Sequence, residues 1–253
     1  RVFDYRINGK VFIGRDEKML GIEKAVCLCL DRRKDEWEDL RKQCESKGID
    51  FEPYVVGEGN LLNNEEYDRI DDESADMSEW GYGNDTTKIR HYNAFMSHIE
   101  IFKKMKEEGV KRFLMLEDDA YFTERFDDVM SRLGNYIVDF ENLDFDMLFL
   151  GWWIGEADDA WNETVERMYS EHGHVGVGIV SEAHFTCGGM HGVIINHTML
   201  DKLIELEPVN PIDSQLNRDL HKEMKTYYVM PKVIHDKGLF SNCEQNRLER
   251  KKL

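Results

Sequence analysis

Three consecutive carboxylates stand at one point of this sequence, directly after a short apolar run. Residues 113–116 are apolar, and Glu117, Asp118 and Asp119 follow at once. A short apolar run bounded by polar residues is typical of a strand that is buried on both faces. Open α/β sheets bind their ligands outside the C-terminal ends of such strands. Three like charges repel one another there, and a hard divalent cation with oxygen ligands relieves that repulsion.

Two interpretations of this acidic segment stay open from the residues alone. A bound divalent ion would bridge the phosphate oxygens of a diphosphate substrate and stabilise the charge on its leaving group. The alternative is a solvated strand end, since the chain has 51 Asp and Glu against 33 Lys and Arg. If a metal is bound, the two-residue period of an extended segment puts Glu117 and Asp119 on its side, while Asp118 points elsewhere.

The composition excludes some classes of protein. A net charge of −18 over 253 residues argues against nucleic acid as the main partner, because binding its phosphates takes clustered cations. No apolar run approaches the roughly 18 residues that a membrane span needs. The five cysteines lack metal-ligand spacing, and Cys27 and Cys29 are expected to be packed thiols. A reducing, cytoplasmic location is therefore expected; the endoplasmic reticulum or Golgi lumen is the alternative if a leader preceded Arg1.

The elements that must position the carboxylates follow from the hydrophobic pattern. A hairpin is predicted at 3–13, around Asn8-Gly9, with strands at 25–30, 49–56, 113–116, 145–150, 193–196 and 227–234. Helices are predicted at about 35–47, from 88 onward, near 124–138, at 199–206 and near 213–225. Residues 57–86 and 154–182 are expected to be irregular excursions.

This order of elements predicts the fold class and the domains. Strands that alternate with helices over short connections indicate an α/β fold, a single Rossmann-like domain with a mostly parallel central sheet flanked by helices. We expect residues 1–22 to form an N-terminal hairpin arm and residues 23–253 to form the domain.

Five short motifs in order resemble those of one known family. They are Leu28-Cys29-Leu30-Asp31-Arg32-Arg33, Ser97-His98-Ile99, Leu116-Glu117-Asp118-Asp119, the segment 189–206, and Pro211-Ile212-Asp213. They resemble glycosyltransferase family 25, the lipooligosaccharide and collagen galactosyltransferase group, over about residues 25–245. There are three departures: Cys29 replaces the usual Asn, His191-Gly192-Val193 stands where the family has His-Ala-Tyr, and His235 falls where the family tends to carry Gln.

The resemblance implies a fold, a reaction and its partners. It implies a GT-A fold, a UDP-sugar as donor substrate and usually Mn²⁺ as cofactor. The implied reaction is the inverting transfer of a hexose, with galactose favoured, to a hydroxyl of a glycan or glycoprotein acceptor. The first two departures motivate one alternative, a catalytically silent binding or adhesion module of glycosyltransferase-like fold. A metal-dependent phosphohydrolase that uses the same carboxylates is a third reading.

The resemblance and the residue chemistry together assign site residues. The predicted metal ligands are Glu117, Asp119 and His235, which lies where the family tends to carry Gln; Asp213 is the predicted catalytic base. The predicted donor-binding residues are Leu30, Asp31, Arg32, Arg33, Lys88, His98, Asp118 and Trp152. Arginine suits phosphate because its planar fork donates two parallel hydrogen bonds. Lys88 opens a helix, where amide groups favour an anion.

Structural roles remain open for several of these residues. Asp31 and Asp213 are also good helix-capping residues. His98 lies beside an apolar helical stripe, so a satisfied core histidine is its alternative role. Trp152 and its neighbour Trp153 follow a buried strand through Gly151, a position where core and rim packing is common.

Overall fold

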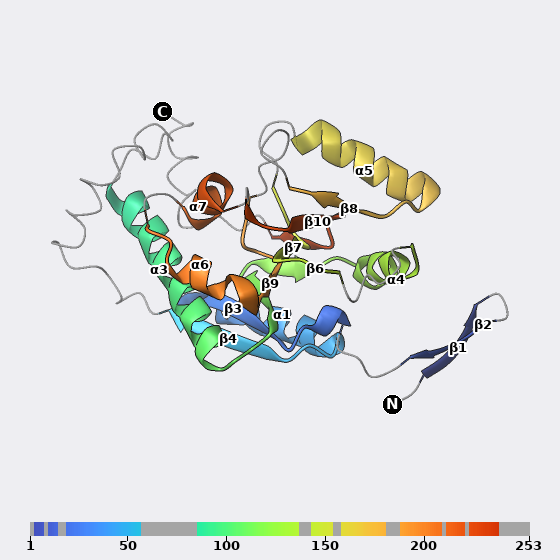
Figure 1. Ribbon diagram of the computed structural model, residues 1–253, viewed down its shortest axis with the longest axis horizontal. Coiled ribbons are helices and arrows are strands. Elements are labelled where there is room, and N and C mark those ends of the chain that lie inside the picture. The colour runs from blue at the N-terminus through green and yellow to red at the C-terminus, as the bar shows by residue number, and fades with distance from the viewer. Residues whose placement is uncertain are drawn as a thin grey trace.

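The structure is a computed structural model, and it describes residues 3–7, 10–14, 19–56, 85–136, 143–153, 158–180, 188–208, 211–220 and 223–237. Its centre is a seven-stranded sheet of order β4-β3-β5-β9-β7-β10-β8 (Figure 1). The strands are β3 (Lys24–Leu30), β4 (Phe51–Val56), β5 (Arg112–Glu117), β7 (Met147–Phe149), β8 (Gly176–Ile179), β9 (Val193–Asn196) and β10 (Thr226–Met230).

The sheet is mostly parallel. β3 pairs in parallel with β4 and β5, and β7 pairs in parallel with β10. β9 runs antiparallel between β5 and β7, and β8 runs antiparallel at the edge beside β10. Five of these seven strands therefore run the same way, which confirms the predicted α/β fold with a mostly parallel central sheet.

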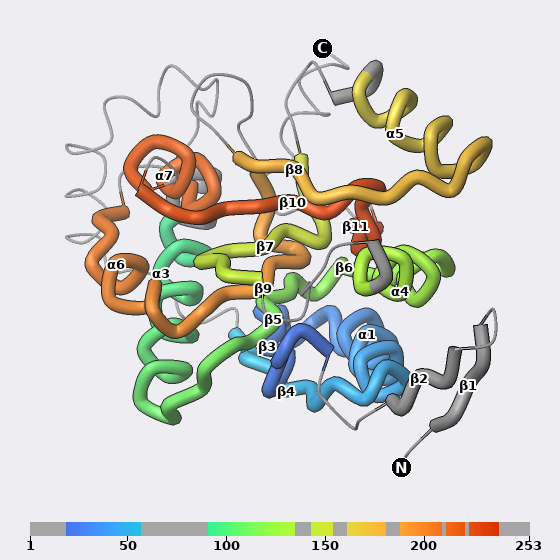
Figure 2. The backbone as a smooth tube through the Cα atoms, turned by 45° about the vertical axis from the view of Figure 1, so that its right-hand side comes forward, coloured from blue at the N-terminus to red at the C-terminus, as the bar shows by residue number. Residues whose placement is uncertain are grey.

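Helices cover both faces of the sheet. They are α1 (Lys34–Ser46), α3 (Asp85–Glu107), α4 (Phe126–Tyr136), α5 (Asp158–His172), α6 (Leu200–Ile204) and α7 (Ile212–Asp219). Figure 2 shows α3, α6 and α7 on one side of the sheet and α1 and α4 on the other. Successive strand residues alternate between the two faces: Phe113 and Met115 join the core under α3, and Leu114 joins the core under α1.

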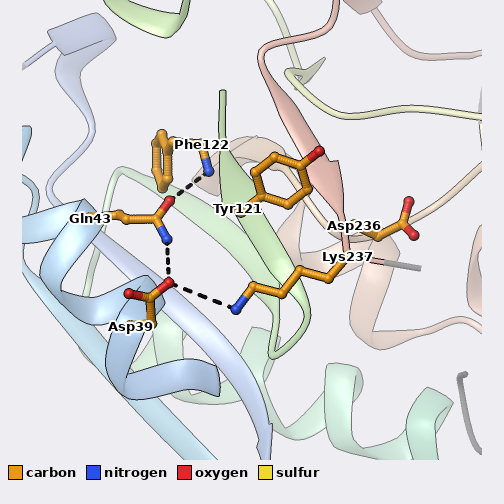
Figure 3. A pocket seen from close by; sticks show the side chains of 6 residues that line it. All are labelled: Asp39, Gln43, Tyr121, Phe122, Asp236 and Lys237. Carbon is orange, nitrogen blue, oxygen red and sulfur yellow. Dashed lines mark hydrogen bonds and ion pairs between the residues drawn. The ribbon is translucent and has the colours of Figure 1, made fainter. Parts of the chain in front are cut away.

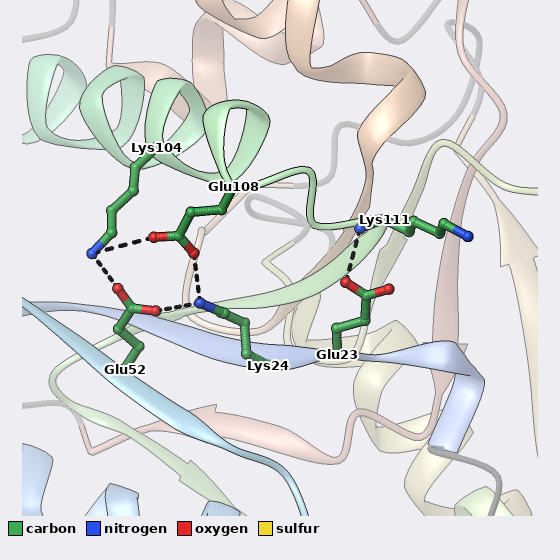
Figure 4. Close-up of polar contacts among 6 residues, drawn as sticks. All are labelled: Glu23, Lys24, Glu52, Lys104, Glu108 and Lys111. Atoms are coloured by element: carbon green, nitrogen blue, oxygen red, sulfur yellow. Dashed lines mark hydrogen bonds and ion pairs between the residues drawn. The ribbon is translucent and has the colours of Figure 1, made fainter.

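A cluster of ion pairs connects the C-terminal end of α3 to the first residues of β3 and β4 (Figure 4). Lys24 Nζ lies 2.6 Å from Glu52 Oε2 and 2.7 Å from Glu108 Oε2, and Lys104 also pairs with Glu52. These groups are partly exposed, so each pair contributes on the order of 1 kcal/mol or less. The cluster stands at the first residues of β3 and β4, which is the end of the sheet opposite the carboxylates.

Two predicted segments differ from the structure. Residues 154–182, expected to be irregular, contain α5 and β8. The helical pattern of α5 was present in the sequence, since Trp161, Val165 and Met168 recur at i, i+4 and i+7, so the prediction of an irregular excursion was wrong there. In β8, a Cβ at Gly178 would lie 2.1 Å from the ring of Tyr228, so the neighbouring strand requires glycine there.

The predicted strand at 227–234 is in fact two strands in different sheets. β10 ends at Met230, and Pro231 follows through a cis peptide bond. Proline has no N–H to continue the ladder, so the chain leaves the sheet there. The next strand, β11 (Ile234–Asp236), pairs antiparallel with β6 (Ala120–Phe122), with Asp236 opposite Ala120.

Three further predictions concern the N-terminal hairpin, the excursion at 57–86 and the absence of a membrane span. β1 (Phe3–Ile7) and β2 (Lys10–Gly14) pair antiparallel around Asn8-Gly9, as predicted, although the division into an arm and a domain stays a prediction. The expected excursion at 57–86 lies outside the described residues except for its last two positions, which begin α3. In the part of the chain that the structure describes, no helix is long and apolar enough to cross a membrane.

Candidate active site

The candidate site lies at the C-terminal ends of β3, β5 and β7, which share one edge of the sheet because these strands run the same way. Leu30 ends β3, Glu117 ends β5, and the segment 150–153 follows β7. This edge is where the acidic segment was expected to meet a ligand.

Asp118 fastens two strand ends together. Its side chain is buried, its Oδ2 accepts a hydrogen bond from the Leu30 amide at 2.9 Å, and its Oδ1 lies 2.8 Å from Arg33 Nη1. The carboxylate thus fixes the short turn Asp31–Arg33, in which Asp31 and Arg32 are exposed and Arg33 is half-buried. The Asp118 side chain points toward the chain that follows β3, and Asp119 Oδ2 lies 3.9 Å from the same Arg33 Nη1.

Burial and neighbouring carboxylates disfavour the charged forms of Glu117 and Asp119. Burial, and then the charges of Asp119, Asp213, Asp118 and Asp236, raise the pKa of Glu117 to about 8. Burial and Asp118 raise the pKa of Asp119 to about 6, although Arg33, 3.9 Å away, opposes the shift. Both carboxyls would lose this penalty if a cation lay between them.

The carboxylate oxygens of Glu117 and Asp119 suit a hard divalent ion, but the protein alone does not supply all the ligands that such an ion needs. Among the described residues, no three His, Cys, Asp or Glu side chains gather closely enough to hold a metal ion. Ions of the Mg²⁺ and Mn²⁺ type are commonly held by one or two carboxylates together with substrate phosphates and water. Glu117 and Asp119 fit that arrangement, because they offer oxygen ligands beside further carboxylates.

Asp213 faces the same region from α7. Its Oδ2 accepts a hydrogen bond from the Gly189 amide at 3.1 Å, and its Oδ1 accepts one from the Ser214 amide at 2.8 Å. Pro211, not Asp213, occupies the cap position of α7, so Asp213 lies in the first helical turn. Its charge acts on Glu117 and on His98, which places the predicted base near both.

His98 lies in the core beneath this region. It is fully buried on α3, and its Nδ1 lies 2.7 Å from the Ala94 carbonyl oxygen. Burial lowers the pKa of His98, against the opposing effects of Ala94 and Asp213, so the imidazole is neutral at pH 7. Its Nε2 has no hydrogen-bond partner among the described residues. His98 is therefore a buried core residue of α3 and does not lie on the surface of the site.

His235 and Asp236 enter the region on β11. The ring of His235 lies 5.8 Å from that of Tyr121, and its Nε2 lies 3.5 Å from Arg125 Nη2. Burial, then Lys232 and Arg125, lower the pKa of His235, so its charged neighbours include two cations. Asp236, in contrast, raises the pKa values of Glu117 and Asp119. Sequence reasoning missed Asp236, whose only signal was its position beside His235.

An open hollow lies beside Asp236, between α1 and the β6–β11 pair (Figure 3). Its volume is about 530 Å³, and it is lined by Asp39, Gln43, Tyr121, Phe122, Asp236 and Lys237. The Lys237 amide donates to the Asp119 carbonyl oxygen at 2.8 Å, and the Lys237 ammonium donates to Glu36 at 2.8 Å. These bonds tie the segment after β11 both to the acidic motif and to α1.

The two adjacent tryptophans have opposite environments. Trp152 is fully buried, donates from Nε1 to the Val229 carbonyl oxygen at 2.8 Å and packs edge-on against Tyr228. Trp153 is 49% exposed and forms an antiparallel bridge with Gly188. Trp152 is thus a core residue, and Trp153 carries the accessible ring of this pair. The side chain of Lys88, on α3, lies outside the described part of the structure.

Comparison with known proteins defines the class to which this fold and site belong. The model of glycosyltransferase family 25, described as an LPS biosynthesis protein family, matches residues 28–214. The chain belongs to this family, and its α/β fold with a mostly parallel central sheet is the one predicted.

Individual relatives are distant. Human procollagen galactosyltransferase 2 is 21% identical over 132 residues, which are 52% of this chain and 21% of that protein. The chain therefore matches about a fifth of that relative's length. Two solved structures are also similar. A glycosyltransferase involved in the glycosylation of the major capsid of PBCV-1 has 10% identity and a TM-score of 0.42, with 90% of this chain and 99% of that chain covered. A197 from STIV has 10% identity and a TM-score of 0.39, with 81% of each chain covered.

Proposed function

We propose that this protein is a metal-dependent inverting glycosyltransferase that moves a hexose from a UDP-sugar to a hydroxyl of a glycan or protein acceptor. The observation that carries the proposal is the family match over residues 28–214, which includes Glu117 and Asp119 at the C-terminal end of β5. Galactose is the favoured sugar because the chain resembles a protein named a procollagen galactosyltransferase. The resident cation is Mn²⁺ or another divalent ion.

The donor binds along the ends of β3 and β5 in this proposal. Asp31 and Arg32 are exposed there and can reach the base, ribose or phosphates, while Asp118 holds Arg33 and the Leu30 amide in place. Glu117 and Asp119 would hold the cation together with the diphosphate oxygens. When bound, the cation neutralises the charge that develops on the UDP leaving group. His235 stays a predicted further ligand.

Asp213 acts as the general base. The acceptor hydroxyl attacks the anomeric carbon from the face opposite UDP; its oxygen forms the new glycosidic bond as the bond to UDP breaks, and its proton passes to Asp213. Two backbone amides, of Gly189 and Ser214, orient this carboxylate. Each oxygen accepts one of these bonds and keeps further acceptor capacity for the hydroxyl.

The buried position of Cys29 weakens the alternative, a catalytically silent binding module. Cys29 is fully buried, and its thiol donates to the Cys27 carbonyl oxygen at 3.2 Å. This departure from the family motif therefore affects core packing. The departure at His191-Gly192-Val193 does lie next to the candidate site, close to Asp213.

The test measures UDP release from a panel of UDP-sugars with Mn²⁺, together with calorimetry of UDP with and without the metal. The proposal predicts turnover of at least one donor and UDP binding that depends on Mn²⁺. A module would bind a glycan or protein yet ignore the metal, and a phosphohydrolase would release phosphate without sugar transfer. Absence of both turnover and nucleotide binding contradicts the proposal.

A further inference from the structure

We propose that Trp153 is the sugar-binding platform of this site and that its indole face stacks on a pyranose ring held beside Asp213. The inference rests on the proposed function and adds a residue that decides which sugar is accepted. Trp153 is 49% exposed, whereas Trp152 is fully buried. Single exposed apolar residues are common on protein surfaces, so exposure alone carries no argument. The argument comes from how the indole is held and from what lies next to it.

The backbone holds Trp153 firmly. Its amide donates to the Gly188 carbonyl oxygen at 3.0 Å, and the Gly188 amide donates to the Trp153 carbonyl oxygen at 3.0 Å. The His191 ring stands edge-on to the indole, with ring centroids 6.5 Å apart and planes at 80°. A rigid aromatic ring loses little conformational entropy when a ligand packs on it.

The His191 ring packs closely against Gly151 and Gly189, and this packing fixes its position. A Cβ at Gly151 would lie 2.6 Å from His191 Cδ2, and a Cβ at Gly189 would lie 2.7 Å from His191 Cε1. Gly189 also has a φ of +87°, which L side chains rarely adopt. The imidazole therefore fills space that two side chains would otherwise occupy, and it supports the edge of the indole.

Gly188 stands next to both Trp153 and Asp213. A Cβ at Gly188 would lie 3.3 Å from Asp213 Oδ2 and 3.9 Å from Trp153 Cβ. Gly188 thus lies close to both Trp153 Cβ and the Asp213 carboxylate, which brings the indole and the proposed base to the same part of the site. The Gly189 amide fixes the same carboxylate oxygen at 3.1 Å.

An apolar face next to a carboxylate matches the chemistry of a sugar. A pyranose ring presents an apolar C–H face and a rim of hydroxyl groups. Ligand sites in proteins commonly combine aromatic walls with a few placed polar groups. With the C–H face on the indole, a hydroxyl on the rim can donate to Asp213. The sugar is either the donor hexose or a sugar of the acceptor, since both must meet beside the base.

The test compares Trp153→Ala, Trp153→Leu and Trp153→Phe with the wild-type protein. Leu keeps apolar bulk without an aromatic face, and Phe keeps a smaller aromatic face. We expect the alanine and leucine variants to raise KM for one sugar-bearing substrate about tenfold, with partial rescue by phenylalanine. Binding of UDP itself, which lacks the transferred hexose, should stay unchanged. Trp161→Ala, which removes another exposed indole on α5, is the matched control and should change none of these values.

Two arms distinguish the source of the sugar. A rise in KM for the UDP-sugar, with a smaller affinity difference between UDP and UDP-sugar, assigns Trp153 to the donor. A rise confined to the acceptor KM assigns it to the acceptor. Unchanged KM values for both the UDP-sugar and the acceptor overturn the inference. A leucine variant that restores KM as well as the phenylalanine variant does also overturns it. If the alanine variant fails to fold, the leucine and phenylalanine variants still decide. Absence of UDP binding in the wild type would instead count against the proposed function.

Discussion

The Gly189 amide donates a hydrogen bond of 3.1 Å to Oδ2 of Asp213, and it joins the turn before β9 to the first turn of α7. The bond holds the proposed base in one orientation at the end of the sheet where Glu117 lies. Because Gly189 has a φ of +87°, the turn that presents this amide depends on glycine.

Gly189→Ala tests that dependence. A Cβ there would lie 2.7 Å from His191 and 3.0 Å from Trp153 Cδ1, in a backbone conformation that alanine disfavours. We expect the free energy of unfolding to fall by about 1 to 3 kcal/mol and kcat to fall at least tenfold. UDP affinity should be nearly unchanged, because the donor groups lie at β3 and β5. Denaturant titration and steady-state kinetics measure both effects; full activity in this variant would argue against Asp213 as the base.

Asp118 and Asp119 should respond oppositely to removal in the metal-free protein. Asp118→Ala leaves the Leu30 amide and Arg33 without their buried acceptor, so we expect a loss of about 1 to 3 kcal/mol in unfolding free energy. Asp119→Ala removes a carboxyl whose pKa is already raised, so stability should be unchanged or slightly higher. Thermal or urea unfolding without metal compares the pair. Equal destabilisation by both substitutions would show that the two carboxylates do not have these separate roles.

The raised pKa of Glu117 predicts a pH dependence of stability. A carboxyl whose pKa is about 8 in the folded state and 4.5 in the reference state binds more protons when folded, so its contribution to stability falls as pH rises through that window. One proton contributes a slope of at most about 1.4 kcal/mol per pH unit. Stability without metal should therefore decline between pH 5 and 8, and Glu117→Gln should flatten the decline.

The control for this prediction is Glu163→Gln, which neutralises an exposed carboxylate on α5. It should leave the pH slope as in the wild type. Adding Mn²⁺ should reverse the trend above pH 7, because the ion binds the deprotonated carboxylate. Identical slopes for wild type and Glu117→Gln would contradict the assignment.

The sequence predicted the parts of this site that depend on local pattern. The apolar run before Glu117 predicted β5 and its acidic end. Asp118 and Asp119 lie in the turn after this strand, so the two-residue period of a strand does not extend to them. The partner of Asp118 could not be predicted, because the contact with Leu30 depends on the register between β3 and β5, which are 88 positions apart at this bond.

Long-range pairing also explains what sequence reasoning missed. Asp236 reaches the site because Pro231 ends β10 and the chain then pairs with β6; Pro231, which has no N–H for a strand ladder, was the sequence signal for that break. Trp152 and Trp153 are equivalent in sequence, and only the packing of Tyr228 and Val229 shows that Trp152 is the buried one. α5 was missed although Trp161, Val165 and Met168 recur at the helical spacing i, i+4 and i+7.

Calorimetry of UDP binding to wild type and Asp119→Ala, each with and without Mn²⁺, tests the central claim most directly. The account predicts that Mn²⁺ strengthens UDP binding to the wild type and that Asp119→Ala loses this increment while it folds normally. Activity of the variant should fall by about two orders of magnitude, the scale for losing a key electrostatic stabiliser. An Asp119→Ala variant that binds UDP with undiminished dependence on Mn²⁺ would contradict the metal site.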